Sequence, residues 1–177
     1  MNTHRLIIAI VLGLLVFTSN PLGAQEQAPP PYVGSEAFER MKQLAGSWEG
    51  MMDMGKGPMK VSASYKVTSN GSALIETVFE GAPHEMITVY HDDSQHQVNM
   101  THYCSLGNQP KMKLASMNGD TLSFNLSQDA DIDEAHDMHM HAAAVTFNGK
   151  DQITQQWTKF EPGKPNQTVK VAYSRIQ

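Results

Sequence analysis

The stretch Ala45-Gly46-Ser47-Trp48-Glu49-Gly50 separates a short helical pattern from a long series of strand patterns. Before it, Phe38, Met41 and Leu44 recur every three residues and form one apolar helix face. Gly46 ends this helix, since glycine commonly follows the last helical turn. After it, apolar and polar residues alternate with a period of two. The stretch therefore marks the point where the chain enters a β-sheet, and we expect the helix to cover one end of that sheet.

The alternation continues to the end of the chain and is divided by turn residues. Asn-Gly pairs at 70–71, 118–119 and 148–149 suit tight turns, because both residue types accept positive φ. Roughly nine or ten strands follow one another at a spacing of about 8–12 residues, and one helix is visible. The sequence predicts an all-β fold: an antiparallel up-and-down β-barrel of about nine or ten strands with one short N-terminal helix.

The N-terminal region has the composition of an export signal followed by a linker. Arg5 precedes an apolar run from Leu6 to Phe17, which is shorter than the roughly 20 residues of a stable membrane span. Ala24 is a small residue suited to signal cleavage. We therefore predict a signal peptide at 1–24, a Pro-rich tether at 25–34, a barrel domain at 35–177 and a secreted or periplasmic protein without a transmembrane span.

Charge and cysteine content narrow the function classes. The formal net charge is -5 with no basic cluster, which argues against a nucleic-acid partner. Cys104 is the single cysteine, so an intrachain disulfide is excluded and we expect a buried, inert thiol. The acidic segment 128–137 lacks the order of a calcium-binding loop and predicts a solvated loop. No nucleophile elbow, phosphate loop or dinucleotide motif occurs, so an enzyme on this scaffold is the third hypothesis.

Strand parity places several polar side chains on the inner face of the predicted barrel. Polar side chains among apolar ones on this face favour a cavity over a closed core, because buried polar groups need hydrogen-bond partners. Parity leaves Glu76 and Glu85 open, since apolar residues compete on both faces of their strands. The predicted pocket consists of Met100, His102, His139, His141, Gln155, Trp157 and Tyr173. A small-molecule ligand in this cavity is the first hypothesis.

The His139-Met140-His141 segment supports a second hypothesis. On a regular strand His139 and His141 project to one face about 7 Å apart, a spacing that suits one metal ion. His102, on another inward-facing position, is the predicted third ligand. Zinc or copper fits such imidazole ligands. Axial ligation of a haem by one of these histidines is a further alternative.

The Gly46-x-Trp48 opening resembles that of the calycin superfamily, which includes lipocalins and fatty-acid-binding proteins. In that superfamily an arginine near the end of the last strand packs over the tryptophan, and Arg175 stands at the matching place. The segment Gly46-Ser47-Trp48-Glu49-Gly50 also resembles the opening of nitrobindin-like haem-binding barrels. The chain is similar as well to secreted bacterial barrel proteins of unassigned function. The resemblance implies a barrel with an interior ligand site, and a structural role for Trp48 and Arg175.

Overall fold

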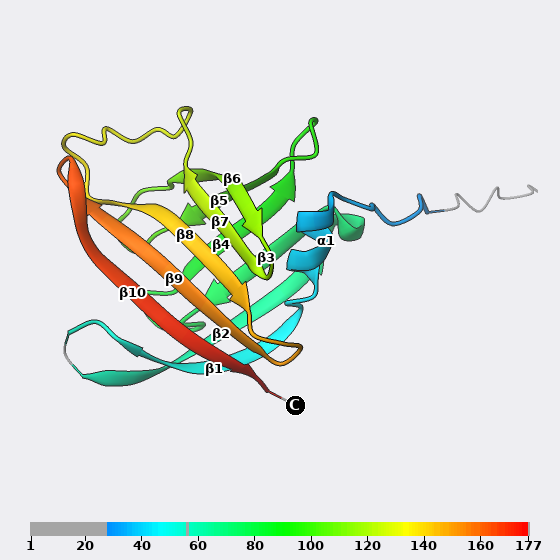
Figure 1. Cartoon of the computed structure of the whole chain (residues 1–177), viewed down its shortest axis with the longest axis horizontal. Helices are drawn as coiled ribbons and strands as arrows, with labels where there is room; N and C mark the ends of the chain where they lie inside the picture. The colour runs from blue at the N-terminus through cyan, green and yellow to red at the C-terminus, as the bar shows by residue number, and fades with distance from the viewer. Residues whose placement is uncertain (1–27, 56, 177) are drawn as a thin grey trace, which may run out of the picture.

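The computed structural model describes residues 28–55 and 57–176, so the predicted signal segment 1–24 lies outside the described residues. The structure contains one helix, α1 (Glu36–Lys42), and a short turn, η1 (Ser69–Gly71). Ten strands follow α1 (Figure 1): β1 (Gly46–Asp53), β2 (Pro58–Thr68), β3 (Ala73–Val78), β4 (Met86–Asp92), β5 (Val98–Tyr103), β6 (Lys111–Asn118), β7 (Thr121–Leu126), β8 (His139–Phe147), β9 (Gln152–Glu161) and β10 (Lys164–Arg175).

The strands form a closed antiparallel barrel, and the predicted fold class is confirmed. Each strand pairs with its neighbours in the sequence, and β1 pairs with β10 to close the sheet. The closing register places Trp48 opposite Arg175. A loop at one end of the barrel joins each strand to the next, as expected of an up-and-down barrel. Among the described residues, no helix is long and apolar enough to cross a membrane.

Helix α1 covers one end of the barrel (Figure 1). Ser35 caps its N-terminus by accepting a hydrogen bond from the Phe38 backbone N–H, and the Ser35 hydroxyl also donates to Asp92 Oδ1 at 2.8 Å. The apolar face predicted from the sequence points into the barrel, because the side chains of Phe38, Met41 and Leu44 are completely buried. The helix therefore supplies part of the core at this end.

The predicted packing of Arg175 over Trp48 lies directly beneath α1. Trp48 is fully buried and its indole N–H donates to the Leu44 carbonyl at 2.8 Å. The Arg175 guanidinium stands 4.2 Å from the centre of a Trp48 ring and donates to the carbonyls of Gln43 and Ala45. Gly46 has φ +127°, and a Cβ there would lie 2.8 Å from Arg175 Nη1. Glycine is favoured here because residues with a Cβ rarely adopt this positive φ.

Both ends of the described chain lie at the α1 end of the barrel (Figure 1). The Ile176 backbone N–H donates to the Ser47 carbonyl, beside the start of β1. The described part of the Pro-rich tether contacts the barrel: the Tyr32 N–H donates to the Asn70 carbonyl, and the Asn70 amide donates to Pro29 and Pro30. The predicted Pro-rich tether is therefore held against the barrel at these residues.

Candidate functional site: an interior cavity

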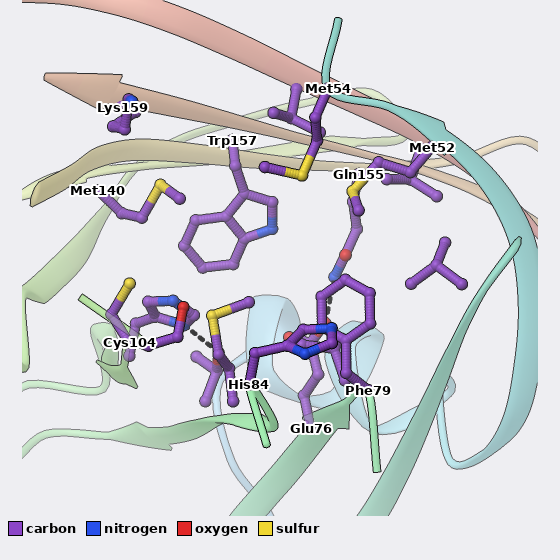
Figure 2. Close-up of a pocket in the computed structure, with 18 of the residues that line it drawn as sticks. Met52, Met54, Glu76, Phe79, His84, Cys104, Met140, Gln155, Trp157 and Lys159 are labelled. Carbon is purple, nitrogen blue, oxygen red and sulfur yellow. Dashed lines mark hydrogen bonds between the residues drawn. The ribbon is translucent and has the colours of Figure 1, made fainter. Parts of the chain in front are cut away.

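A cavity of about 260 Å³ occupies the half of the barrel remote from α1. It is bounded by the inner faces of the strands and by the β3–β4 and β5–β6 loops. Most of its wall is apolar, and Figure 2 shows Met54 and Met140 beside the indole of Trp157, with Met52 near Gln155. Met59 and Met86 contribute two further thioethers. Methionine is flexible and polarisable, so this wall can adapt to the shape of a bound molecule.

Glu76 forms a polar floor to this apolar space. Its Oε1 accepts hydrogen bonds from the Tyr65 hydroxyl at 3.0 Å and from the Gln155 amide at 2.7 Å. Its Oε2 accepts one from the Tyr90 hydroxyl at 2.6 Å. Figure 2 shows Glu76 and Gln155 meeting at this floor. Glu76 also lines the cavity, and a carboxylate accepts about four hydrogen bonds, so one acceptor position on Oε2 stays open.

Burial shifts the pKa values of the ionisable groups in this floor. Desolvation raises the pKa of Glu76, while the hydrogen bonds from Tyr90, Gln155 and Tyr65 lower it; burial is the larger effect. Burial, together with the nearby Glu76 carboxylate, raises the pKa of both tyrosines well above its usual range, so they stay protonated donors. The floor is therefore a set of donors that converge on a single acidic group.

His102 is the second polar feature of the cavity. Its Nδ1 lies 2.9 Å from the Thr88 hydroxyl, and its ring packs on Trp157 with ring centres 4.6 Å apart. Burial lowers the pKa of His102 to about 4, so the imidazole is neutral at physiological pH. Its Nε2 is buried and has no hydrogen-bond partner among residues 28–55 and 57–176. A buried polar atom without a partner costs roughly 1–3 kcal/mol, so a ligand or water that reached it would be stabilising.

The cavity mouth carries one cation and one thiol. Lys159 lines the cavity and its Nζ donates to Glu161 Oε1 at 3.2 Å. Cys104, also in the wall, has a pKa raised by burial. The cysteine is thus a protonated thiol, in agreement with the buried and inert group expected from the sequence.

Four of the seven predicted pocket residues line this cavity: His102, Gln155, Trp157 and Tyr173. Met100 is buried on the same strand as His102 but lies in the core away from the cavity lining. His139 and His141 do not line the cavity, so their predicted inward orientation is wrong. The reason is a register shift in β8 between Met140 and Ala142, an irregularity that reverses the faces of a strand. Met140 therefore points into the cavity in their place.

His139 and His141 lie close to each other and to Glu134 instead. His139 Nε2 lies 3.1 Å from His141 Nδ1, and His141 Nδ1 lies 3.6 Å from Glu134 Oε2. In the described part of the chain, the three residues offer ligand atoms that all lie within 4.8 Å of one another, and His102 is not among them. The predicted metal set of His102, His139 and His141 therefore does not assemble.

The cavity also does not fit a haem. Its volume is below the range of about 300–1,000 Å³ typical of drug-sized ligands, and a porphyrin is larger than most of these. Of the two imidazoles that line it, His102 is stacked on Trp157 with an enclosed Nε2, and His84 packs against Phe79 in the β3–β4 loop. His139 and His141 stand outside the cavity wall.

The sequence did not assign Glu76 to the cavity or identify its two tyrosine partners, Tyr65 and Tyr90. The parity of β3 was ambiguous, because apolar residues occupy both of its faces. The pattern of the neighbouring strand β2 indicates the orientation of Glu76. Tyr65 shares parity with the apolar residues Val61 and Ala63, and it stands opposite Glu76 in the β2–β3 register. Glu134 was also missed, because it belongs to an acidic run that otherwise predicts solvent exposure.

Comparisons with known proteins support the fold. No protein-family model and no curated protein matches the chain. A solved protein of unknown function from the DUF3598 family of Nostoc punctiforme is similar in structure, with a TM-score of 0.52 and 10% identity over 84% of this chain and 51% of that protein. The chain thus spans about half the length of this neighbour. A redesigned β-barrel is similar over 77% of this chain and 94% of its own, with a TM-score of 0.36 and 11% identity.

Proposed function

We propose that this protein binds a small, mainly apolar molecule that carries one hydrogen-bond-donating group, in the cavity between Trp157 and Glu76. The observation that carries the proposal is the composition of the cavity wall: mainly apolar side chains surround about 260 Å³ of space, and a few polar groups interrupt them, among them Glu76 and Gln155 at the floor and His102 in the wall. Small-molecule sites have this composition, since apolar walls supply affinity and a few polar groups set orientation.

The polar end of the ligand belongs at the floor. Glu76 Oε2 has one acceptor position left, so a hydroxyl or amine on the ligand would donate there. His102 Nε2 offers a second polar contact higher in the wall. The cavity volume limits the ligand to a molecule smaller than most drug-sized ligands. Two fused aromatic rings with one hydroxyl are a suitable probe of this chemistry.

We also propose that the protein acts after export and that it is a calycin-like barrel. The apolar run after Arg5 supports export. The burial of Trp48 beneath Arg175 supports the calycin-like assignment, because this pair is the feature on which the resemblance depends.

The binding proposal is tested with naphthalene and 2-naphthol, which differ by one hydroxyl. We expect both to bind the purified protein and 2-naphthol to bind about 5- to 10-fold more tightly, because one net hydrogen bond contributes about 1 kcal/mol. Calorimetry measures both affinities, and native mass spectrometry of the untreated protein identifies any molecule that co-purifies. Failure of both probes to bind, with no co-purifying molecule, would contradict the proposal.

A matched pair of variants locates the binding site on one strand. Val169 lines the cavity, whereas its neighbour Lys170 is exposed on the outer face of β10. Val169→Trp fills the cavity and is expected to abolish probe binding, and Lys170→Trp adds the same side chain outside and leaves binding unchanged. In the unmodified protein, Trp157 fluorescence gives a separate signal of probe binding, because Trp48, the other tryptophan of the chain, lies at the α1 end. Equal probe affinity in the two variants would place the site elsewhere.

A further inference from the structure

A second group of ligand-type side chains lies where β8 begins, outside the cavity. His139 is fully buried, His141 is half-buried and Glu134 is an exposed residue of the loop before β8. None of the three lines the cavity. An inference about this group is therefore independent of the ligand proposed above.

The distances within the group match those around a tetrahedral metal ion. Zinc binds nitrogen and oxygen ligands at about 2.0–2.1 Å in tetrahedral geometry, which places neighbouring ligand atoms about 3.3 Å apart. The observed separations lie on either side of this value: 3.1 Å between His139 Nε2 and His141 Nδ1, and 3.6 Å between His141 Nδ1 and Glu134 Oε2. All three ligand atoms lie within 4.8 Å of one another, so a single ion would reach them with small side-chain adjustments.

The hydrogen bonding of His139 prepares its ring for a metal. Its Nδ1 lies 2.8 Å from the Asp137 carbonyl oxygen, which can only accept, so Nδ1 carries the proton. The lone pair is then on Nε2, the atom that faces His141. A backbone carbonyl on the far nitrogen is the usual way in which proteins fix the tautomer of a metal-binding histidine.

The other two ligands are also held in place. The His141 ring stacks on Phe160 with centres 3.7 Å apart and an angle of 10° between the planes. The backbone carbonyl of Glu134 accepts a hydrogen bond from the Gly163 N–H at 2.9 Å, which ties its loop to the β9–β10 turn. The Asn108 amide donates to the Met138 carbonyl at 2.8 Å, just before β8. The loop that carries the carboxylate therefore has fixed contacts on both sides.

We propose that Glu134, His139 and His141 form a Zn²⁺ site at the open rim of the barrel. Two imidazoles and one carboxylate are ligands that zinc prefers, and three protein ligands leave the fourth tetrahedral position for water or another small ligand. Calcium is disfavoured because it takes six to eight oxygen ligands. Cu(I) is disfavoured because its preferred thioethers are not in the group: Met140 points into the cavity.

Without an ion, the same geometry is a hydrogen bond from His141 Nδ1–H to His139 Nε2. Metal uptake distinguishes a metal site from a histidine pair that is only hydrogen-bonded. The full exported chain is freed of metal with a chelator, and Zn²⁺ is added at pH 7.5 in a calorimeter. We expect one Zn²⁺ per chain, and a Co²⁺-loaded sample with the visible absorption bands of tetrahedral cobalt.

Three variants test the ligands and keep the fold. Glu134→Gln changes an exposed side chain, His141→Phe keeps an aromatic ring against Phe160, and His139→Ala removes the buried imidazole. We expect each histidine variant to weaken Zn²⁺ binding more than about a hundredfold, because loss of an outer-shell partner alone costs roughly 10- to 100-fold. Glu134→Gln is expected to weaken binding at least about tenfold. Circular dichroism verifies that each variant is folded, and Glu134→Gln and His141→Phe suffice if His139→Ala is not.

His136→Ala is the matched control. His136 is an exposed imidazole three residues before His139, and it pairs with Asp133 outside the group. We expect this variant to bind Zn²⁺ like the unmodified protein. The proposal is overturned if the unmodified protein takes up no Zn²⁺, if folded Glu134→Gln and His141→Phe bind it as tightly as the unmodified protein, or if Ca²⁺ competes at equal concentration.

Discussion

Burial shifts the pKa values of His102 and Glu76 in opposite directions, because in each case it disfavours the charged form. It lowers the pKa of His102 to about 4 and raises that of Glu76, so in both cases it favours the neutral form. The two groups then differ in how they link stability to pH. A histidine with a depressed pKa loses stability as the pH falls, whereas a carboxyl group with a raised pKa gains it.

We expect His102 to make the fold sensitive to mild acid. Unfolded histidine has a pKa near 6.5, so between about pH 6.5 and 4 the unfolded chain binds the extra proton and the free energy of unfolding falls. The loss attributable to His102 is about 2 kcal/mol at pH 5. Urea unfolding of the unmodified protein and of His102→Gln at pH 7 and pH 5 measures it as the difference in pH dependence.

The exposed imidazole of His91 provides the control for this measurement. His91→Gln is expected to keep the pH dependence of the unmodified protein. Because the contribution of Glu76 has the opposite sign and is present in every sample, only the difference between variants is interpreted. Identical pH dependence in His102→Gln and the unmodified protein would contradict the expectation.

At the scale of elements, α1 and the closing strands β1 and β10 form one structural unit. Trp48 on β1 lies beneath the helix, and Arg175 on β10 donates to the carbonyls at the helix C-terminus. Helix α1 has seven residues, too few for a stable isolated helix, so its stability depends on these contacts.

Trp48→Ala is expected to lower the free energy of unfolding by roughly 3–5 kcal/mol, as a large truncation in a packed core. Urea denaturation measures the change. The comparison is Trp157→Ala, because Trp157 is only partly buried and already borders a cavity. We expect Trp157→Ala to lower the free energy of unfolding less than Trp48→Ala. A larger loss for Trp157→Ala would contradict the proposed packing at the α1 end of the barrel.

Ser35→Ala is expected to destabilise the protein by about 0.5–2 kcal/mol, the usual cost of a lost N-cap. The change removes the acceptor for the Phe38 N–H and the hydroxyl that donates to Asp92. Thermal unfolding provides the measurement. Ser174→Ala, at an exposed position of β10, serves as the control. The expectation is contradicted if both substitutions lower the stability of the protein equally.

The strands were predictable from sequence to a greater extent than the faces they present. A period of two identifies a strand without reference to its surroundings, so the barrel and its turns follow from the pattern alone. One extra residue in β8 reverses the face of everything before it, and the segment from His139 to Ala142 contains no glycine or proline to mark the shift. The assignment of Glu76 failed for a related reason: its environment is set by neighbouring strands.

At the scale of the whole molecule, the barrel has one end filled by a helix and one end with a cavity. This arrangement agrees with the short helix predicted before the first strand. The loops at the open end of the barrel come from five separate connections, so their mutual distances depend on barrel closure. The meeting of Glu134 with His139 and His141 has a local cause instead: all three lie where the β7–β8 loop enters β8, and the sequence does not mark the register shift between Met140 and Ala142 that orients them.

We expect the exported protein to begin near Gln25, because the apolar run ends before the small residue Ala24. Expression of the full chain in a bacterial host, followed by cell fractionation and N-terminal sequencing of the recovered protein, tests this. Recovery of a membrane-bound chain that begins at Met1 would show that the segment is retained. Replacing Leu14 and Leu15 in the apolar run with arginine is the control, and it is expected to keep the chain in the cytoplasm.

The described chain begins and ends at the α1 end of the barrel (Figure 1), and the Met-rich cavity lies in the opposite half. An attachment made at residue 28 or residue 176, such as a surface, a carrier protein or a membrane anchor, therefore sits at the α1 end. The mouth would face away from that attachment and exchange its contents freely with the surrounding fluid. A sensor surface carrying the protein by either terminus should thus present every cavity in a working orientation, whereas coupling through a side chain at the rim would obstruct it.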